Sequence, residues 1–576
     1  MKVHYIVDIQ NPQHHYVKVT LKLTRPSGAD KVKFFLPVWS PGSYLVREYA
    51  RHIRWFEASQ SNGEILFHTQ FEKSLWEVEW SRSDLRQHLD EFQVSYEIYC
   101  KELTVRTSHV DASHAFLHGP SYLVGVQGET ILNPTIEFRF PKAWSKLSTS
   151  LKDISKTRDH FIYSALNYDE LIDCPVEIGC HETDGFEYKG KFHHIANYGL
   201  IYPHKNELKA DIQKVVQTVA KHFDEDLPYE SYLFINHFVP KLYGGLEHLN
   251  STALQFDGRK LVNRKDYLNY LSLLGHEYFH LWNVKRIRPI ELGPFDYSNE
   301  NYTTMLWLAE GLTSFMDDLF VYRAGISTLE EYLEIVKGNF EMYFGSPGRN
   351  YHSLEQSSLN AWVKLYRPDE NSKNSSISYY LKGGLVFMVL QSLLLEKGKS
   401  VDDLLKALWS DFKAHPERGI TRDDLYRMIQ DLGGTETHQK FSLMIETTLD
   451  IDFDSALKKM GCEFKWAENN QPWLGVEWEG GERAIIKSVL LDSPAYKSGL
   501  NSGDEIIFVN GIRFMKEDAS NIPNQFLLDR PYQFIVSRLG KLERIEVLFG
   551  KSPRNLKEIS IIDRSLAEKS FGFKSH

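Results

Sequence analysis

The interpretation of the whole chain starts from one stretch, Leu273-Leu274-Gly275-His276-Glu277-Tyr278-Phe279-His280-Leu281-Trp282. It is apolar and lacks proline, which favours an α-helix from about Asp266, a suitable N-cap, to His280. Because residues i and i+4 share one helix face about 6 Å apart, His276 and His280 can point at one tetrahedral metal ion. Glu277 can then reach a metal-bound water without being a ligand, as in zinc hydrolases. The alternative is a pair of packed or solvated histidines.

A third metal ligand has to come from another segment, because catalytic zinc usually has three protein ligands and one open position. The helix-compatible run from Thr304 to Asp318 is strongly apolar in its first three turns around one carboxylate, Glu310. Burying a lone carboxylate is costly unless it is paired or binds a metal, so Glu310 is the best candidate. A pairing with a Lys or Arg in the core is the alternative. With Glu310, the two histidines would form a two-His, one-Glu site for one zinc ion.

Two further segments suit a peptide substrate. Gly244 and Gly245 permit close backbone approach, and Glu247 follows on an expected strand that could pair with a peptide at a sheet edge. Glu247 could hold the free α-amine of that peptide; a Gly-Gly turn with a solvated Glu is the alternative. Tyr379 and Tyr380 open a predicted helix, and either could donate its phenol to an oxyanion or be an ordinary core residue.

Composition limits the other possibilities. The 576 residues predict about three or four domains, at roughly 150 residues each. A hydrophobic content of 42%, a charged content of 25% and a net charge of -10 are typical of a globular protein, and nothing favours nucleic acid. The N-terminus lacks a signal-peptide pattern and no apolar run reaches membrane-spanning length, so we expect a cytoplasmic protein that binds no membrane. Four scattered cysteines predict buried free thiols, although Cys174 and Cys180 could form a local bridge or a metal pair.

The pattern along the chain predicts a multidomain α+β protein. Residues 1–190 alternate with period two and predict a β-rich domain, residues 191–470 are mainly helical, residues 471–552 form a compact β-rich module, and residues 553–576 are a weakly patterned tail. Within the first domain, the aromatic loop 37–49 could touch a neighbouring domain or pack on its own sheet. His114 and His118, beside a Gly-Pro turn, could line a cleft, but a structural turn is the simpler interpretation.

Several of these motifs together resemble the glycyl aminopeptidase family of zinc metallopeptidases, which is related to the aminopeptidase N family. They are the blocks 276–286, Trp307-Leu308-Ala309-Glu310-Gly311, Gly244-Gly245-Leu246-Glu247-His248, Tyr380-Leu381-Lys382-Gly383 and the loop 37–49. Leu246 and His248 depart from the family's Met and Asn. The resemblance implies a β-rich N-terminal domain, a thermolysin-like catalytic domain and a C-terminal PDZ domain. In the PDZ domain Leu474, Gly475 and Val476 would bind a peptide C-terminus.

The resemblance also implies an activity. One zinc ion per chain, held by His276, His280 and Glu310, would serve an aminopeptidase that prefers small N-terminal residues such as Gly or Ala. Glu277 would be the general base and Tyr380 the oxyanion donor. The alternatives are a PDZ-targeted zinc endopeptidase and a peptide-binding scaffold without turnover. The sequence leaves open whether the chain forms a homo-oligomer.

Overall fold

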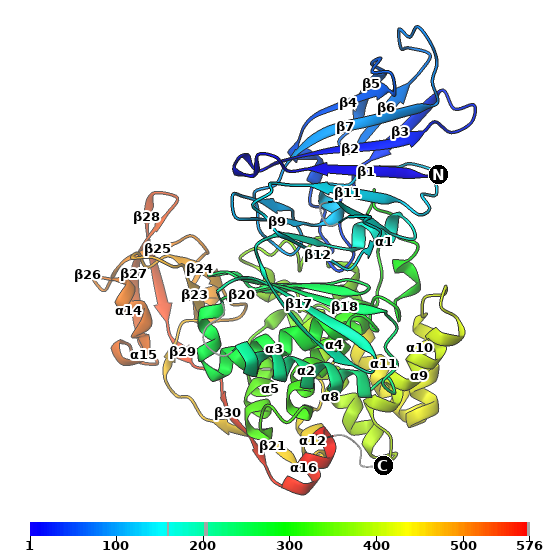
Figure 1. Cartoon of the computed structure of the whole chain (residues 1–576). Coiled ribbons are helices and arrows are strands. Elements are labelled where there is room, and N and C mark those ends of the chain that lie inside the picture. Colours follow the sequence, from blue (N-terminus) through cyan, green and yellow to red (C-terminus); the bar gives the residue numbers. More distant parts are fainter. Residues whose placement is uncertain (158–159, 201–204, 573–576) are drawn as a thin grey trace. The chain divides into compact units, whose positions relative to one another are not determined.

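The computed structural model describes residues 1–157, 160–200 and 205–572 (Figure 1). These residues form two compact units. The first unit consists of Met1–Tyr302 with Ala324–Ile326 and Leu405–Thr421, and the second of Thr303–Arg323, Ser327–Leu404 and Arg422–His576. The multidomain α+β organisation predicted from the sequence is confirmed: β-sheets come first, helices follow, and a small β-rich module lies near the C-terminus.

The N-terminal part of the first unit consists of three β-sheets. The seven-stranded sheet has the order β13 (Lys152–Asp153), β14 (Phe161–Ser164), β11 (Thr135–Arg139), β1 (Val3–Asp8), β2 (Tyr16–Thr24), β7 (Glu91–Tyr99), β4 (Ile53–Gln60). A four-stranded sheet has the order β10 (Gly125–Val126), β3 (Lys31–Phe35), β6 (Leu75–Glu79), β5 (Phe67–Glu72). Another has the order β12 (Lys146–Thr149), β15 (Val176–Gly179), β9 (His114–Leu117), β8 (His109–Val110). Buried and less buried residues alternate along β2 because one face packs against the core.

A five-stranded sheet completes the first unit. Its order is β16 (Glu182–Tyr188), β17 (Lys191–Gly199), β18 (Ser231–Phe238), β20 (Ser251–Phe256), β19 (Gly244–Glu247). Strands β17, β18 and β20 are parallel, whereas β19 runs antiparallel at the edge. Helices α2 (Lys205–Lys221) and α3 (Arg264–Phe279) lie together against this sheet (Figure 1). The Gly-Gly segment is therefore an edge strand and not a turn.

Helix α3 carries the His-Glu-x-x-His motif, but its ends differ from the prediction. Its N-cap is Asn263, whose side-chain oxygen accepts hydrogen bonds from the backbone N–H groups of Lys265 and Asp266. The helix ends at Phe279, and His280 is the C-cap residue, still with helical backbone angles. Asn263 and Asp266 are both good capping residues, and the sequence alone does not decide between them.

The second unit contains most of the helices. Glu310 lies in a π-helical turn, η6 (Trp307–Gly311), which continues as α4 (Leu312–Arg323). Further helices before the C-terminal module are α5 (Leu329–Phe344), α6 (Leu354–Leu359), α7 (Ser372–Ser375), α8 (Tyr379–Leu395), α10 (Arg422–Gly433), α11 (Thr435–Glu446) and α12 (Phe453–Lys459), and α9 (Val401–Ala414) has residues in both units. A Cβ added to Gly311 would lie 2.7 Å from the Cα of Gly383, so η6 and α8 touch backbone to backbone. Only glycine permits this approach, which fixes Glu310 against the start of α8.

The C-terminal module has a core of its own, formed by residues between Leu474 and Phe549. Its strands are β22 (Pro472–Trp473), β23 (Val476–Trp478), β24 (Ile486–Val489), β25 (Glu505–Val509), β26 (Ile512–Arg513), β27 (Pro531–Arg538), β28 (Lys541–Leu548) and β29 (Gly550–Lys551). The strand before the module, β21 (Cys462–Ala467), pairs with the strand after it, β30 (Asn555–Ile561). Helix α16 (Arg564–Phe571) follows, in place of the weakly patterned tail that the sequence predicts.

None of the described helices is both long and apolar enough to span a membrane. All four cysteines are free: Cys100, Cys174 and Cys462 are buried, and Cys180 is exposed. The local bridge between Cys174 and Cys180 considered from the sequence is therefore absent.

Candidate functional site

The two histidines of α3 are arranged as a pair of metal ligands. Their ring centroids lie 4.6 Å apart and the rings are nearly perpendicular, at 85°. The Nδ1 of His280 lies 2.7 Å from the carbonyl oxygen of Asn283. Because a carbonyl only accepts, this Nδ1 carries the proton and Nε2 keeps its lone pair for a metal.

Glu277 lies directly beneath the edge strand β19. Its side chain is buried, and a Cβ added to Gly245 would lie 2.1 Å from its Oε1. Glu277, Glu247 and His280 each offer a ligand atom within 4.8 Å of the others. Two buried carboxylates this close repel each other unless a cation or a proton lies between them. The donor set therefore fits positively charged ligands, a metal ion among them.

Glu247 sits at the end of β19, covered by the aromatic loop 37–49. A Cβ added to Gly42, which has φ of +82°, would lie 2.4 Å from Oε1 of Glu247. That Oε1 is buried and has no hydrogen-bond partner among the residues the structure describes. In the same loop, Trp39 Nε1 donates to the carbonyl oxygen of Asp296 at 2.7 Å. The loop therefore contacts residues outside the N-terminal sheets, and Tyr49 at its end also packs into the core of those sheets.

Arg106 also contacts the edge strand, and sequence reasoning missed it. Its guanidinium donates to the carbonyl oxygen of Gly245 at 3.1 Å, and its own carbonyl accepts from the Tyr49 hydroxyl at 2.7 Å. These contacts hold β19 in place from the N-terminal sheets. Arg106 stands in an irregular loop, far from Gly245 in sequence, and no local pattern marks it.

His248, which replaces the family's Asn, has a fixed partner. Its Nδ1 lies 3.2 Å from Oδ1 of Asp173, and Lys285 Nζ lies 2.7 Å from the same oxygen. Burial alone would raise the pKa of Asp173, but the charges of Lys285 and His248 hold it well below its usual range. The ionised Asp173 thus ties the end of the exopeptidase block to the segment that follows α3.

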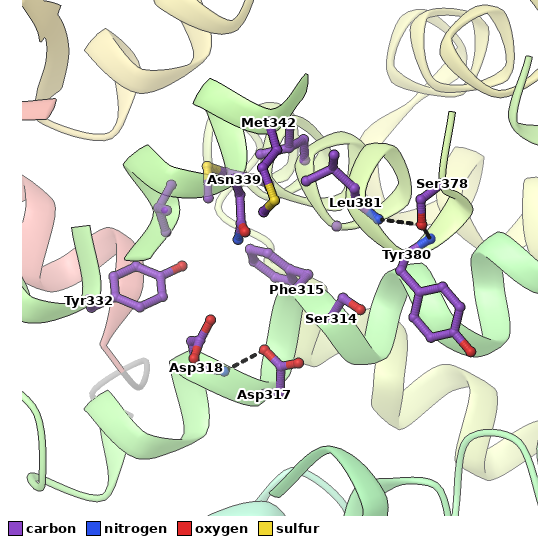
Figure 2. Close-up of a pocket in the computed structure, with 14 residues that line it drawn as sticks. Ser314, Phe315, Asp317, Asp318, Tyr332, Asn339, Met342, Ser378, Tyr380 and Leu381 are labelled. Carbon is purple, nitrogen blue, oxygen red and sulfur yellow. Dashed lines mark hydrogen bonds between the residues drawn. The ribbon is translucent and has the colours of Figure 1, made fainter. Parts of the chain in front are cut away.

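In the second unit, Tyr380 lines a cavity of about 350 Å³ between α4, α5 and α8 (Figure 2). The side-chain oxygen of Ser378 caps α8 by accepting from the N–H of Tyr380 at 3.2 Å. The hydroxyl of Tyr380 lies 3.3 Å from that of Tyr366. Burial, followed by the charge of Glu310, raises the pKa of Tyr380 well above its usual range. The phenol of Tyr380 therefore remains a proton donor near Glu310.

Tyr379 is oriented differently. Its side chain is fully buried and stacks on Tyr380 with ring centroids 4.8 Å apart. It does not line the cavity. Tyr380 therefore lines this cavity and Tyr379 does not; which of the two faces the metal site stays a prediction.

Comparison with known sequence families explains why these motifs occur together. The model described as M61 glycyl aminopeptidase matches residues 269–386, and the model of the peptidase M61 N-terminal domain matches residues 4–180. A PDZ domain model matches residues 458–528. The two M61 models together span just over half of the chain.

The chain belongs to the M61 glycyl aminopeptidase family. The resemblance predicted from the motifs is thus confirmed, and this M61 peptidase is a metallo-aminopeptidase. Its fold is similar to that of an aminopeptidase N family protein from Idiomarina loihiensis, with 26% identity over 99% of this chain and 100% of the other, and a TM-score of 0.91. An M1 zinc metallopeptidase from Deinococcus radiodurans is more distant, with 13% identity over 78% of this chain and 94% of the other, and a TM-score of 0.49.

In the PDZ domain of this M61 peptidase, the predicted peptide-binding residues occupy a turn before β23. Leu474 is buried in the domain core, Gly475 has φ of +80°, and Val476 begins the strand. A Cβ added to Gly475 would lie 2.2 Å from the Cβ of Ser493, so glycine is needed for a steric reason as well as for its φ.

Proposed function

We propose that this M61 peptidase uses zinc to remove small N-terminal residues from peptides. The observation that supports this most strongly is the gathering of Glu247, Glu277 and His280 at the edge of the five-stranded sheet. The carboxylate of Glu247 suits a substrate ammonium, and that of Glu277 suits a proton taken from water. The name of the family supports glycine as a preferred N-terminal residue. The backbone of Gly42 against Glu247 leaves little room for a large side chain there.

His276, His280 and Glu310 would hold the one zinc ion. The histidines support this through the contact of His280 Nδ1 with the carbonyl oxygen of Asn283, which orients the ring, and through the arrangement of the two rings. Glu310 supports it through its burial, at 2% exposure, in a π-helical turn, an element frequent at functional sites. Bound zinc would supply a Lewis acid for the scissile carbonyl and lower the pKa of a bound water.

The protein's own residues account for the remaining chemistry. The substrate backbone pairs with the edge strand at Gly244 and Gly245, as strand addition allows. Glu247 binds the α-ammonium, which sets cleavage after the first residue. Glu277 takes a proton from the attacking water and passes it to the leaving amine. Tyr380 donates a hydrogen bond to the carbonyl oxygen as negative charge develops on it.

The PDZ domain would bind the C-terminus of a peptide or protein. Its turn at Leu474, Gly475 and Val476 precedes a strand, β23, to which a further strand could add. Such binding would recruit substrates or partners. Recruitment by the PDZ domain is also compatible with a second candidate function, that of a PDZ-targeted endopeptidase.

An assay on Gly-, Ala- and Leu-anilides and on N-acetylated peptides tests the proposal. We expect hydrolysis of Gly- and Ala-anilides that a chelator abolishes and zinc restores, with little action on acetylated peptides. Glu277→Gln is the control, because it should keep zinc and lose nearly all turnover. Internal cleavage of acetylated peptides at a similar rate would identify an endopeptidase. Zinc-loaded protein without any hydrolysis would support the scaffold function.

A further inference from the structure

A hairpin far from α3 in the sequence gathers a second set of metal-ligand side chains. Strands β8 and β9 pair His109 with Phe116 and Val110 with Ala115, and the same register places Asp111 opposite His114. Residues two apart on a strand share a face, as do residues directly opposite on paired strands. His109, Asp111 and His114 therefore project from one face. Each offers a ligand atom within 4.8 Å of the others.

The two imidazoles are already oriented as metal ligands usually are. Nδ1 of His109 lies 2.6 Å from the carbonyl oxygen of Lys101, and Nδ1 of His114 lies 2.8 Å from Oε1 of Glu177. Metal-binding histidines commonly donate their other N–H to such a carbonyl or carboxylate. With Nδ1 as the donor, each ring keeps a lone pair on Nε2. Nε2 of His114 is buried and has no hydrogen-bond partner in the described part of the chain.

Asp111 completes the set. Its Oδ1 accepts from the backbone N–H and the hydroxyl of Ser113, at 2.7 and 2.6 Å, and from the N–H of His114 at 3.1 Å. Its Oδ2 faces Nε2 of His109 at 3.4 Å. Two lone-pair atoms this close repel each other unless a proton or a metal cation lies between them. Ligand atoms about 2.0–2.1 Å from a tetrahedral zinc ion are themselves about 3.4 Å apart.

We propose that His109, Asp111 and His114 bind a second divalent transition-metal ion, of the zinc class, separate from the catalytic one. Two imidazoles and one carboxylate suit zinc, with water in the remaining position. The His109 and Asp111 side chains are 12% and 37% exposed, so the ion can enter from solvent. The proposal is independent of the catalytic mechanism.

The ion would stabilise the contact between two β-sheets of the first unit. Glu177, which orients His114, also accepts from Nε2 of His237 on β18 at 2.9 Å. The series of contacts from the ion through His114 and Glu177 to His237 thus links the sheet of β8 and β9 to the five-stranded sheet. Glu177, His114 and His237 also form a potential ligand group. We place the ion on the hairpin instead, because hydrogen bonds already occupy the short contacts within that buried group.

Zinc counting on the full chain tests this site. His276→Ala with His280→Ala forms a background without the catalytic zinc. After chelation, the background protein is titrated with zinc against a chromophoric chelator, and bound zinc is counted after gel filtration. We expect one zinc per chain in the background and two in the wild type. His109→Ala or Asp111→Asn in the background should weaken binding by about 100-fold or more, whereas the exposed His88→Ala should not.

The outcomes separate this site from the catalytic one. Zinc should raise the melting temperature of the background protein and leave that of its His109→Ala derivative unchanged, with circular dichroism checking the fold of each. Equal zinc content in wild type and background would argue against the catalytic zinc site and not against the second site. A background protein that binds no zinc at micromolar concentration, or binding that survives both His109→Ala and Asp111→Asn, would overturn the proposal.

Discussion

At the residue scale, Glu247 is the side chain whose environment is hardest to explain without a ligand. It is 4% exposed, and its Oε1 has no hydrogen-bond partner among the described residues. A buried carboxylate is costly unless it meets a positive charge, and a substrate ammonium would supply one. We therefore predict that Glu247→Gln, which keeps the shape, lowers kcat/KM for unblocked Gly peptides about 100-fold, or about 3 kcal/mol.

The comparison substrate for Glu247→Gln is an N-acetylated peptide, which has no ammonium. Its slow cleavage should change little in the variant. Parallel kinetics on the two substrates measure the difference. An equal loss on both would show that Glu247 supports the fold of the site and does not recognise the amine.

The side chain of the proposed general base, Glu277, leaves no room for a residue other than glycine at position 245. Because a Cβ there would lie 2.1 Å from Oε1 of Glu277, Gly245→Ala should displace that carboxylate. We predict a fall in kcat of about 10- to 100-fold with zinc content unchanged, since the metal ligands are not touched. The double variant Gly245→Ala, Glu277→Gln should be no slower than Glu277→Gln alone, because both changes remove one function. Additive losses would contradict this explanation.

Lys382 predicts a pH dependence of stability. It is fully buried, and burial lowers the pKa of its ammonium to about 8, with one hydrogen bond to the carbonyl oxygen of Thr447 at 3.3 Å. In the unfolded chain the group titrates near pH 10.4, so the unfolded state binds more protons between the two values. The resulting cost is fully present below about pH 8 and fades as the pH rises toward 10.4.

Lys382→Met should therefore be more stable than wild type at pH 7. The pKa difference corresponds to about 3 kcal/mol, reduced by about 1 kcal/mol for the lost hydrogen bond. Denaturant unfolding at pH 7, 8.5 and 10 should show the advantage of the variant shrinking as the pH rises. A difference that does not change with pH would mean that burial does not lower the pKa of Lys382.

At the element scale, the contact between η6 and α8 connects two sequence blocks. Gly311 and Gly383 meet backbone to backbone, which sets Glu310 beside the first turn of α8 and hence near Tyr380. Gly383→Ala should push the two elements apart, because its Cβ would lie 2.8 Å from the Cα of Gly311. We predict weaker zinc binding and at least a 10-fold loss of kcat, provided that Glu310 is the third ligand.

The neighbouring Gly384 provides a matched control for this prediction. An added Cβ there would meet its nearest atoms at 3.4 Å, an ordinary contact, and alanine also favours a helix. Gly384→Ala should keep zinc affinity, activity and stability near wild type. Metal titration and thermal unfolding of both variants compare them directly, and equal behaviour would reject the role of the Gly311–Gly383 contact.

The sequence predicted those elements whose pattern is local. The period-two strands of the N-terminal part follow from side-chain spacing alone, and so do helices such as α5, which lies in the stretch predicted to be mainly helical. The i, i+4 histidines could be placed on one helix for the same reason. By contrast, the π-helical turn around Glu310 depends on packing against Gly383, and no residue pattern within 304–318 encodes it.

The parts of the site that the sequence missed depend on contacts between distant segments. Gly42 and Arg106 reach β19 from the N-terminal sheets, and neither is distinguished by its neighbours in sequence. Helix α16 was missed because its amphipathic pattern is short and because its stability depends on the packing of Phe571 against distant residues such as Tyr332. The predicted boundary at residue 190 falls in the turn between β16 and β17, which belong to the same sheet, and stays a prediction.

At the scale of the whole molecule, the PDZ domain is inserted between two paired strands. Strands β21 and β30 flank it, and α16 then returns to the helices of the second unit (Figure 1). Phe571 is fully buried against Tyr332, and its carbonyl oxygen accepts from Arg323 at 2.9 Å. The PDZ domain itself has a separate core and is tied to α7 by polar contacts of Asn374 and Lys373.

Two deletions of the same domain should therefore behave differently. Replacing residues 470–552 by a short Asn-Gly turn keeps the β21–β30 pair and α16, so we expect a melting temperature and Gly-anilide activity close to wild type. Truncation after residue 470 also removes β30 and the buried Phe571, and loss of such a side chain alone costs about 3–5 kcal/mol. Thermal unfolding and anilide kinetics compare the two proteins. If the truncated chain is as stable as the excised one, then α16 does not support the helical part. If excision alone abolishes anilide cleavage, the PDZ domain contributes to the catalytic step and not only to recruitment.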